Sequence, residues 1–195
     1  MLFGDKSEFA IEVIPDPEPT HFSSEGMSGG RMVATGRVRV WMAFSSFGDL
    51  QEPQCCLGTV ANELADMLVG LDNFWHPSFA GQTAEELFDT LDRLLFAAHR
   101  GPCLEESLDR ILAESEAMRP ALRSFMTNSS EAFDRWKAFL VKPPGNVLHV
   151  LWTSEGDVNA IRRSVFDARA YKSAVSAFAN WTDTSEWRSM QKGLE

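Results

Sequence analysis

Residues 36–48 read GRVRVWMAFSSFG, and the alternation of apolar with polar side chains in this stretch predicts a β-strand that is buried on one face. The apolar positions are Val38, Val40 and Met42, and the intervening positions are Arg37, Arg39 and Trp41. We expect strand structure over residues 32–47, either continuous or bent at Gly36, followed by a turn at Gly48 and Asp49.

Two further stretches of the chain also predict strands. Phe9, Ile11 and Val13 predict an earlier strand that ends at Pro15, and residues 16–30 are rich in Pro, Ser and Gly, which predicts a loop. The apolar run at residues 147–151 predicts a late strand, and residues 158–166 predict its return strand.

Apolar positions spaced by three and four predict helices between these strands and after them. One covers residues 59–69, and a second opens at a capping box of Thr83 and Glu86. In the second helix we expect Leu87, Leu91, Leu94 and Leu95 to face inward. We predict a third helix that Pro120 breaks, a fourth marked by Phe133, Trp136, Phe139 and Leu140, and a last one marked by Tyr171, Val175, Phe178 and Trp181.

The predicted class is α+β, with antiparallel strands near the N-terminus and around residues 147–166, a helical middle and a C-terminal helix. With 195 residues, of which 44% are hydrophobic, the chain suits one domain over residues 1–195. No apolar run is long enough for a membrane span, and the start of the chain lacks the features of a signal peptide. Three cysteines, two of them adjacent, favour a reducing cytoplasm over a disulfide framework.

Negative charge is concentrated in the middle of the chain. The formal net charge is -10, made up of -2 in residues 1–48, -11 in residues 49–118 and +3 in residues 119–195. No Lys or Arg lies between Arg39 and Arg93, whereas nine carboxylates do. Segregated charge of this kind favours encounter with a basic partner and disfavours nucleic acid.

Two features inside this window could form an interface. The spacing of Glu85, Asp89 and Asp92 predicts one shared helix face, and an aromatic cluster at residues 74–79 lies in a predicted loop. Aromatic side chains surrounded by acids resemble the centre and rim of a binding surface. The alternatives are that the acids only promote solubility and that Phe74 and Trp75 fill the core.

No pattern of residues points to catalysis or to a metal. The four histidines, His21, His76, His99 and His149, are far apart in sequence, and Cys55 and Cys56 lack the spacer of a zinc-binding pair. The paired acids Glu85 and Glu86 fit the first turn of a helix, where the helix dipole favours negative charge. We therefore expect no catalytic residue, no metal and no cofactor.

Several short stretches resemble the immunity protein 42 family of bacterial polymorphic toxin systems. They are MLFGDKSEFAIE at residues 1–12, Trp41 followed by FGD at residues 47–49, LGT at residues 57–59 before a helix, and LHVLW at residues 148–152. Phe44 departs from the pattern, because a turn glycine is expected there. The resemblance implies a cytoplasmic protein that binds and neutralises a cognate toxin domain, and it implies neither an active site nor a cofactor.

Combined with the charge pattern, the resemblance predicts that an acidic surface occludes the active site of a basic toxin. The residues that we expect to contact the toxin are Asp49, Glu52, Asp72, Trp75, Glu85, Glu86, Asp89 and Asp92. A secretion chaperone or adaptor for an effector is the alternative function, because small size, acidity and an α+β plan suit both. An enzyme without a recognisable motif is a third candidate.

Overall fold

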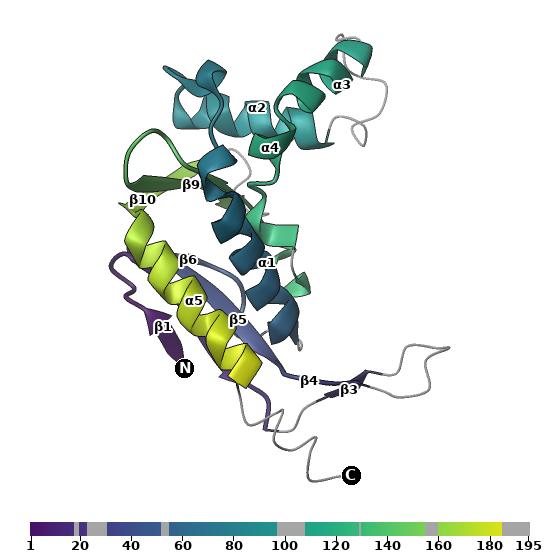
Figure 1. Cartoon of the computed structure of the whole chain (residues 1–195), viewed down its shortest axis with the longest axis vertical. Helices are drawn as coiled ribbons and strands as arrows, with labels where there is room; N and C mark the ends of the chain where they lie inside the picture. The colour runs from purple at the N-terminus through teal and green to yellow at the C-terminus, as the bar shows by residue number, and fades with distance from the viewer. Residues whose placement is uncertain are drawn as a thin grey trace.

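A mixed arrangement of antiparallel sheets and helices makes up the computed structural model, which describes residues 1–17, 20–22, 31–51, 55–96, 108–128, 130–154 and 160–184 (Figure 1). Its first sheet has the order β1-β2-β5-β6. The short strand β7 also pairs with β5, along the part of that edge which β6 leaves unpaired. The strands are β1 (Leu2–Gly4), β2 (Phe9–Pro15), β5 (Thr35–Met42), β6 (Ser45–Phe47) and β7 (Cys55–Cys56).

The pairing of β2 with β5 confirms the period of two in both stretches. Ile11 lies opposite Val40, and Val13 lies opposite Val38, so that the apolar positions of both strands share one buried face. On the other face Glu12 lies opposite Arg39. Because the side-chain period of a strand is two, this register points Ile11, Val13, Val38 and Val40 inward, and the charged Glu12, Arg37 and Arg39 outward.

The continuous strand expected over residues 32–47 is wrong, because the stretch forms three strands. Its first part is β4 (Arg31–Val33), which pairs with β3 (Thr20–Phe22) in a separate two-stranded sheet. The loop expected over residues 16–30 therefore contains a strand. Between β5 and β6 the chain reverses at Ala43 and Phe44, whose φ angles are 47° and 66°.

Positive φ at both central residues is the geometry of a two-residue hairpin turn that normally selects Asn and Gly. Here the turn is held by neighbouring backbone instead. The Ala43 amide donates to the Glu8 carbonyl and the Phe44 amide donates to the Lys6 carbonyl, each over 2.8 Å. Phe44 is 75% exposed, so its ring contributes little burial in return for the unfavourable backbone conformation.

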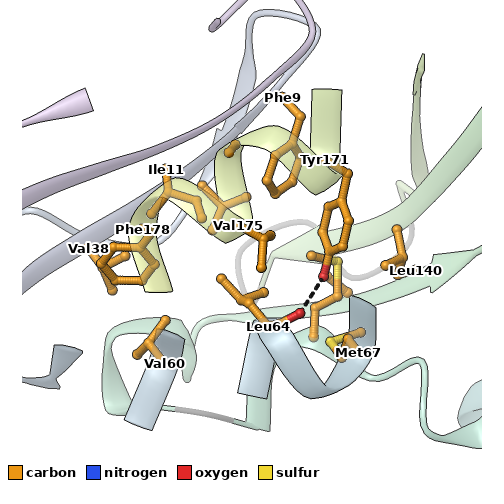
Figure 2. Packing of buried hydrophobic residues seen from close by; sticks show 14 of the residues in the cluster. Phe9, Ile11, Val38, Val60, Leu64, Met67, Leu140, Tyr171, Val175 and Phe178 are labelled. Carbon is orange, nitrogen blue, oxygen red and sulfur yellow. Dashed lines mark hydrogen bonds between the residues drawn. The ribbon is translucent and has the colours of Figure 1, made fainter. Parts of the chain in front are cut away.

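Two helices, α1 (Leu57–Gly70) and α5 (Ala168–Thr184), lie side by side over the inner face of the first sheet (Figure 1). Both were predicted, and Val60, Leu64, Val175 and Phe178 are buried between helix and sheet (Figure 2). The Tyr171 hydroxyl donates a 3.2 Å hydrogen bond to the Leu64 carbonyl and joins the two helices. Burial raises the pKa of Tyr171, so this donor stays protonated.

The second sheet, in the order β10-β9-β8, is a shared layer between two apolar cores. Its antiparallel strands are β8 (Trp136–Val141), β9 (Val147–Ser154) and β10 (Arg162–Asp167). Leu140 and Val150 face the core beneath α1 and α5, whereas Phe139 and Leu151 face a second core. The helix expected at Phe133–Leu140 is wrong, because a strand buried on both faces lacks alternation and its apolar run reads like a buried helix.

The second core is covered by α2 (Ala84–Phe96), α3 (Leu108–Ala117) and α4 (Arg119–Leu122), which lie together beyond the second sheet (Figure 1). As expected, the helical run breaks near Pro120, which lies in the first turn of α4. The described residues also form short 3-10 turns: η1 (Leu71–Asn73), η2 (Pro77–Phe79), η5 (Met126–Asn128) and η6 (Glu131–Phe133). The α+β class is confirmed. Within the described ranges, no helix is long and apolar enough to cross a membrane.

The turn between β5 and β6 generates a stability prediction. Replacing Ala43→Asn together with Phe44→Gly should raise the free energy of unfolding by about 1 kcal/mol. A left-handed conformation costs an L-residue roughly 1–2 kcal/mol, and the larger conformational entropy that Gly loses on folding offsets part of the stabilisation. Urea denaturation measures the difference. Ala43→Val, which puts a β-branched residue at the same φ, should lower the stability instead; a double variant no more stable than the unaltered chain contradicts this account.

Candidate functional site

The first two turns of α2 present three of the predicted carboxylates to solvent. The capping box is confirmed: the Thr83 amide donates to Glu86 Oε2 over 2.8 Å, and the Glu86 amide donates to Thr83 Oγ1 over 3.2 Å. Glu85, Glu86 and Asp89 are all exposed. The cap and the helix dipole fix these acids at the start of α2, so they form a compact negative surface, here called the α2 acidic surface.

Asp92 is not part of the α2 acidic surface, and its expected place on that face is wrong. Only 4% of the residue is exposed, and its carboxylate forms an ion pair with Lys137 of β8. The Lys137 ammonium also lies 4.5 Å from the centre of the Phe96 ring. The sequence prediction took only leucines as the buried side of α2. Phe88 is also buried, and Asp92 follows it by one helical turn, so Asp92 lies on the buried side as well. Asp92 therefore fastens α2 to the second sheet.

Asp72 and Trp75 lie on the connection between α1 and α2. The Asp72 side chain is 89% exposed and its carboxylate lies 3.0 Å from the Lys142 ammonium. Trp75 is half-buried and meets the Phe79 ring edge-on at 5.8 Å, while Phe74 and Phe79 are buried. The aromatic cluster thus supplies core residues at two positions and a partly accessible indole at the third.

Asp49 lies apart from these residues, at the end of β6 in the first sheet. Its carboxylate accepts a 2.7 Å hydrogen bond from the Gln51 amide, and its own amide donates to the Ala132 carbonyl over 3.3 Å. Glu52 lies outside the described residues. Of the eight predicted contacts, the structure gathers three on the α2 acidic surface and places two on the connection that precedes α2.

A groove that the sequence did not reveal opens between the C-terminal half of α1, the C-terminal end of α2, and α4. Its volume is about 780 Å³, and a smaller hollow of about 300 Å³ adjoins it. Met67 and Phe74 form its buried floor, and four half-buried apolar side chains surround them: Leu95, Phe96, Leu122 and Phe125. Three elements distant in sequence build this groove, so no local pattern could have predicted it.

Charges of opposite sign stand on two walls of the groove. Glu63 and Asp66 line it from α1, and Arg123, which follows α4, lines it from the other side. Burial, and then the neighbouring Asp66 carboxylate, raise the pKa of Glu63 above its usual value. Both acids belong to the stretch without Lys or Arg, which was the one sequence signal that pointed toward them.

The outer face of the first sheet carries a different charge pattern. The Lys6 ammonium lies 4.1 Å from the centre of the Trp41 ring, and Glu12 Oε2 accepts hydrogen bonds from Trp41 over 2.8 Å and from Lys6 over 3.1 Å. Burial raises the pKa of Glu12, but these hydrogen bonds outweigh burial and hold the pKa below its usual value. Acids and bases are paired on this face, unlike Glu85 and Asp89 of the α2 acidic surface, for which the structure gives no ion pair among the described residues.

Comparison with known proteins identifies the family of the chain. The sequence model of the family called immunity protein 42 matches residues 1–181. The chain belongs to the immunity protein 42 family. The fold of this family member is similar to that in the crystal structure of CdiI from Burkholderia dolosa AUO158, with a TM-score of 0.57 and 13% sequence identity over 91% of this chain and 97% of that chain. No curated protein sequence matches this chain.

The contrast between Asp92 and Asp89 in this immunity protein can be measured directly. Asp92→Ala should lower the free energy of unfolding by about 2 kcal/mol, because it leaves the Lys137 ammonium without its carboxylate; the partial exposure of Lys137 keeps the loss below that of a fully buried pair. Asp89→Ala, one turn earlier and exposed, is the matched control and should change the stability by less than about 0.5 kcal/mol. Equal effects in urea denaturation would refute the separate roles.

Proposed function

We propose that this chain neutralises a cognate bacterial toxin by binding it, and that it acts in the cytoplasm as a single domain without catalysis or a cofactor. The observation that carries the proposal is the family match over residues 1–181. The fold shared with CdiI from Burkholderia dolosa supports it. Among the described residues, no three His, Cys, Asp or Glu side chains are grouped so that they could hold a metal ion.

The proposed mode of binding is occlusion of a basic active site on the toxin. Glu85, Glu86 and Asp89 project from one end of α2 and can take the place of substrate phosphates beside Lys or Arg side chains. Asp72 and Trp75, on the connection that leads to α2, extend this surface with a carboxylate and a partly accessible indole. Trp and Tyr side chains are frequent anchors of protein interfaces. Asp49 remains a proposed contact at the edge of the first sheet.

Long-range attraction supports the same assignment. Carboxylates that are exposed and not neutralised by adjacent bases raise the association rate with a positively charged partner, by roughly tenfold or more at low salt. The α2 acidic surface fits this role because its acids project from a capped helix and not from a loop, so the backbone positions that carry them are set before the toxin arrives.

Co-expression tests the function. Producing this chain together with the toxin domain encoded by the neighbouring gene should restore growth of cells that the toxin domain alone arrests, and the two proteins should co-purify. A secretion chaperone or adaptor would co-purify with the toxin domain without restoring growth. That outcome would replace neutralisation by the alternative function.

Charge reversal tests the mode of binding. Glu85→Lys with Asp89→Lys should slow association with the toxin domain roughly tenfold at low salt, and should make the rate less dependent on salt concentration. Asp92 is left unchanged because it supports the fold. The matched control is Glu8→Lys with Asp134→Lys, which changes the net charge equally at two exposed positions elsewhere. If both double variants slow association equally, net charge accounts for the effect and the α2 acidic surface does not.

A further inference from the structure

The groove between α1, α2 and α4 has the composition of a site that binds a protein segment. Half-buried Leu95, Phe96 and Leu122 expose apolar surface around a buried floor. The groove, of about 780 Å³, holds water beside both apolar and polar atoms. Releasing such water to bulk favours any apolar group that enters.

The charged residues around the groove indicate which charges a bound segment would carry. Among the described residues, neither Glu63 nor Asp66 forms an ion pair, and the exposed Arg123 likewise has no carboxylate partner there. The neighbouring Arg119 differs, because its guanidinium lies 2.5 Å from the Glu116 carboxylate. Two acids from α1 and one base that follows α4 thus line the groove together with its apolar floor.

We propose that this groove binds one amphipathic segment of the toxin, with an apolar stripe on the floor, a Lys or Arg toward Glu63 and Asp66, and a carboxylate toward Arg123. The inference rests on the proposed neutralising function and adds an anchoring site to it. A lipid or another ligand with a single charged group would satisfy only one wall. A polypeptide segment carries apolar side chains and charges of both signs at once, and amphipathic helices bind apolar grooves in this way.

The placement on α2 allows one toxin to use both surfaces. Glu85 and Asp89 lie in the first two turns of the helix, and Leu95 and Phe96 end it. At 1.5 Å per residue, roughly 10–15 Å along the helix axis separates the α2 acidic surface from the groove. The carboxylates therefore affect the rate of encounter, and the groove affects how long the complex lasts.

A substitution that fills the groove without changing charge separates these two roles. Gly70 lines the groove, and a Cβ there would lie 3.4 Å from the Phe74 ring, which leaves room for a side chain that enters the groove. Gly70→Leu should speed dissociation of the toxin domain encoded by the neighbouring gene at least tenfold, with the association rate almost unchanged. Gly58→Leu, on the same helix with open space at its Cβ, is the matched control and should alter dissociation less than twofold.

Charge removal provides the second variant if Gly70→Leu does not fold, as judged by circular dichroism. Glu63→Gln with Asp66→Asn should weaken binding about fivefold, and Arg123→Gln about twofold, as expected for partly exposed ion pairs. Normal dissociation from Gly70→Leu, or normal affinity of the charge variants, overturns the groove proposal while the proposed function stands. If the unaltered chain forms no complex with the toxin domain, the proposed function fails first and the groove proposal fails with it.

Discussion

The antiparallel register of β2 against β5 is the constraint on which the rest of the structure depends. It places Ile11 opposite Val40 on the face that α1 and α5 cover, and leaves Glu12 opposite Arg39 on the outer face. A shift of one residue would turn Arg37, Arg39 and Trp41 into the core. With this face apolar, the two helices pack on it, and the Tyr171 hydroxyl joins them at Leu64.

The second sheet connects this first core to the surface of the chain that we propose binds the toxin. One of its faces completes the core under α1 and α5, and the other supports α2, α3 and α4. Asp92 and Lys137 fix α2 on this sheet by an ion pair, and Phe88 packs edge-on against Phe139 at a ring distance of 5.2 Å. The orientation of α2 follows, and with it the exposure of its acids and the shape of the groove at its end.

Local signals predicted much of this fold, and residues whose surroundings come from distant elements escaped prediction. The periodicity of α1 and α5 and the capping box of Thr83 and Glu86 depend only on neighbours in sequence. The strand β8 was misread because both of its faces are buried. Asp92 was misplaced because its partner, Lys137, lies 45 residues away. The groove joins α1, α2 and α4, so only Glu63 and Asp66, as acids in a stretch without bases, pointed to it.

Hydrogen–deuterium exchange of the chain alone and in complex with its toxin domain tests most directly whether the toxin occupies this surface. The account predicts slower exchange in the complex at residues 63–75, 85–96 and 119–125, with little change at residues 2–8 and 39–48 on the opposite side of the first core. Protection confined to residues 2–8 and 39–48, with α1, α2 and α4 unchanged, would contradict it and would move the interface to the outer face of the first sheet.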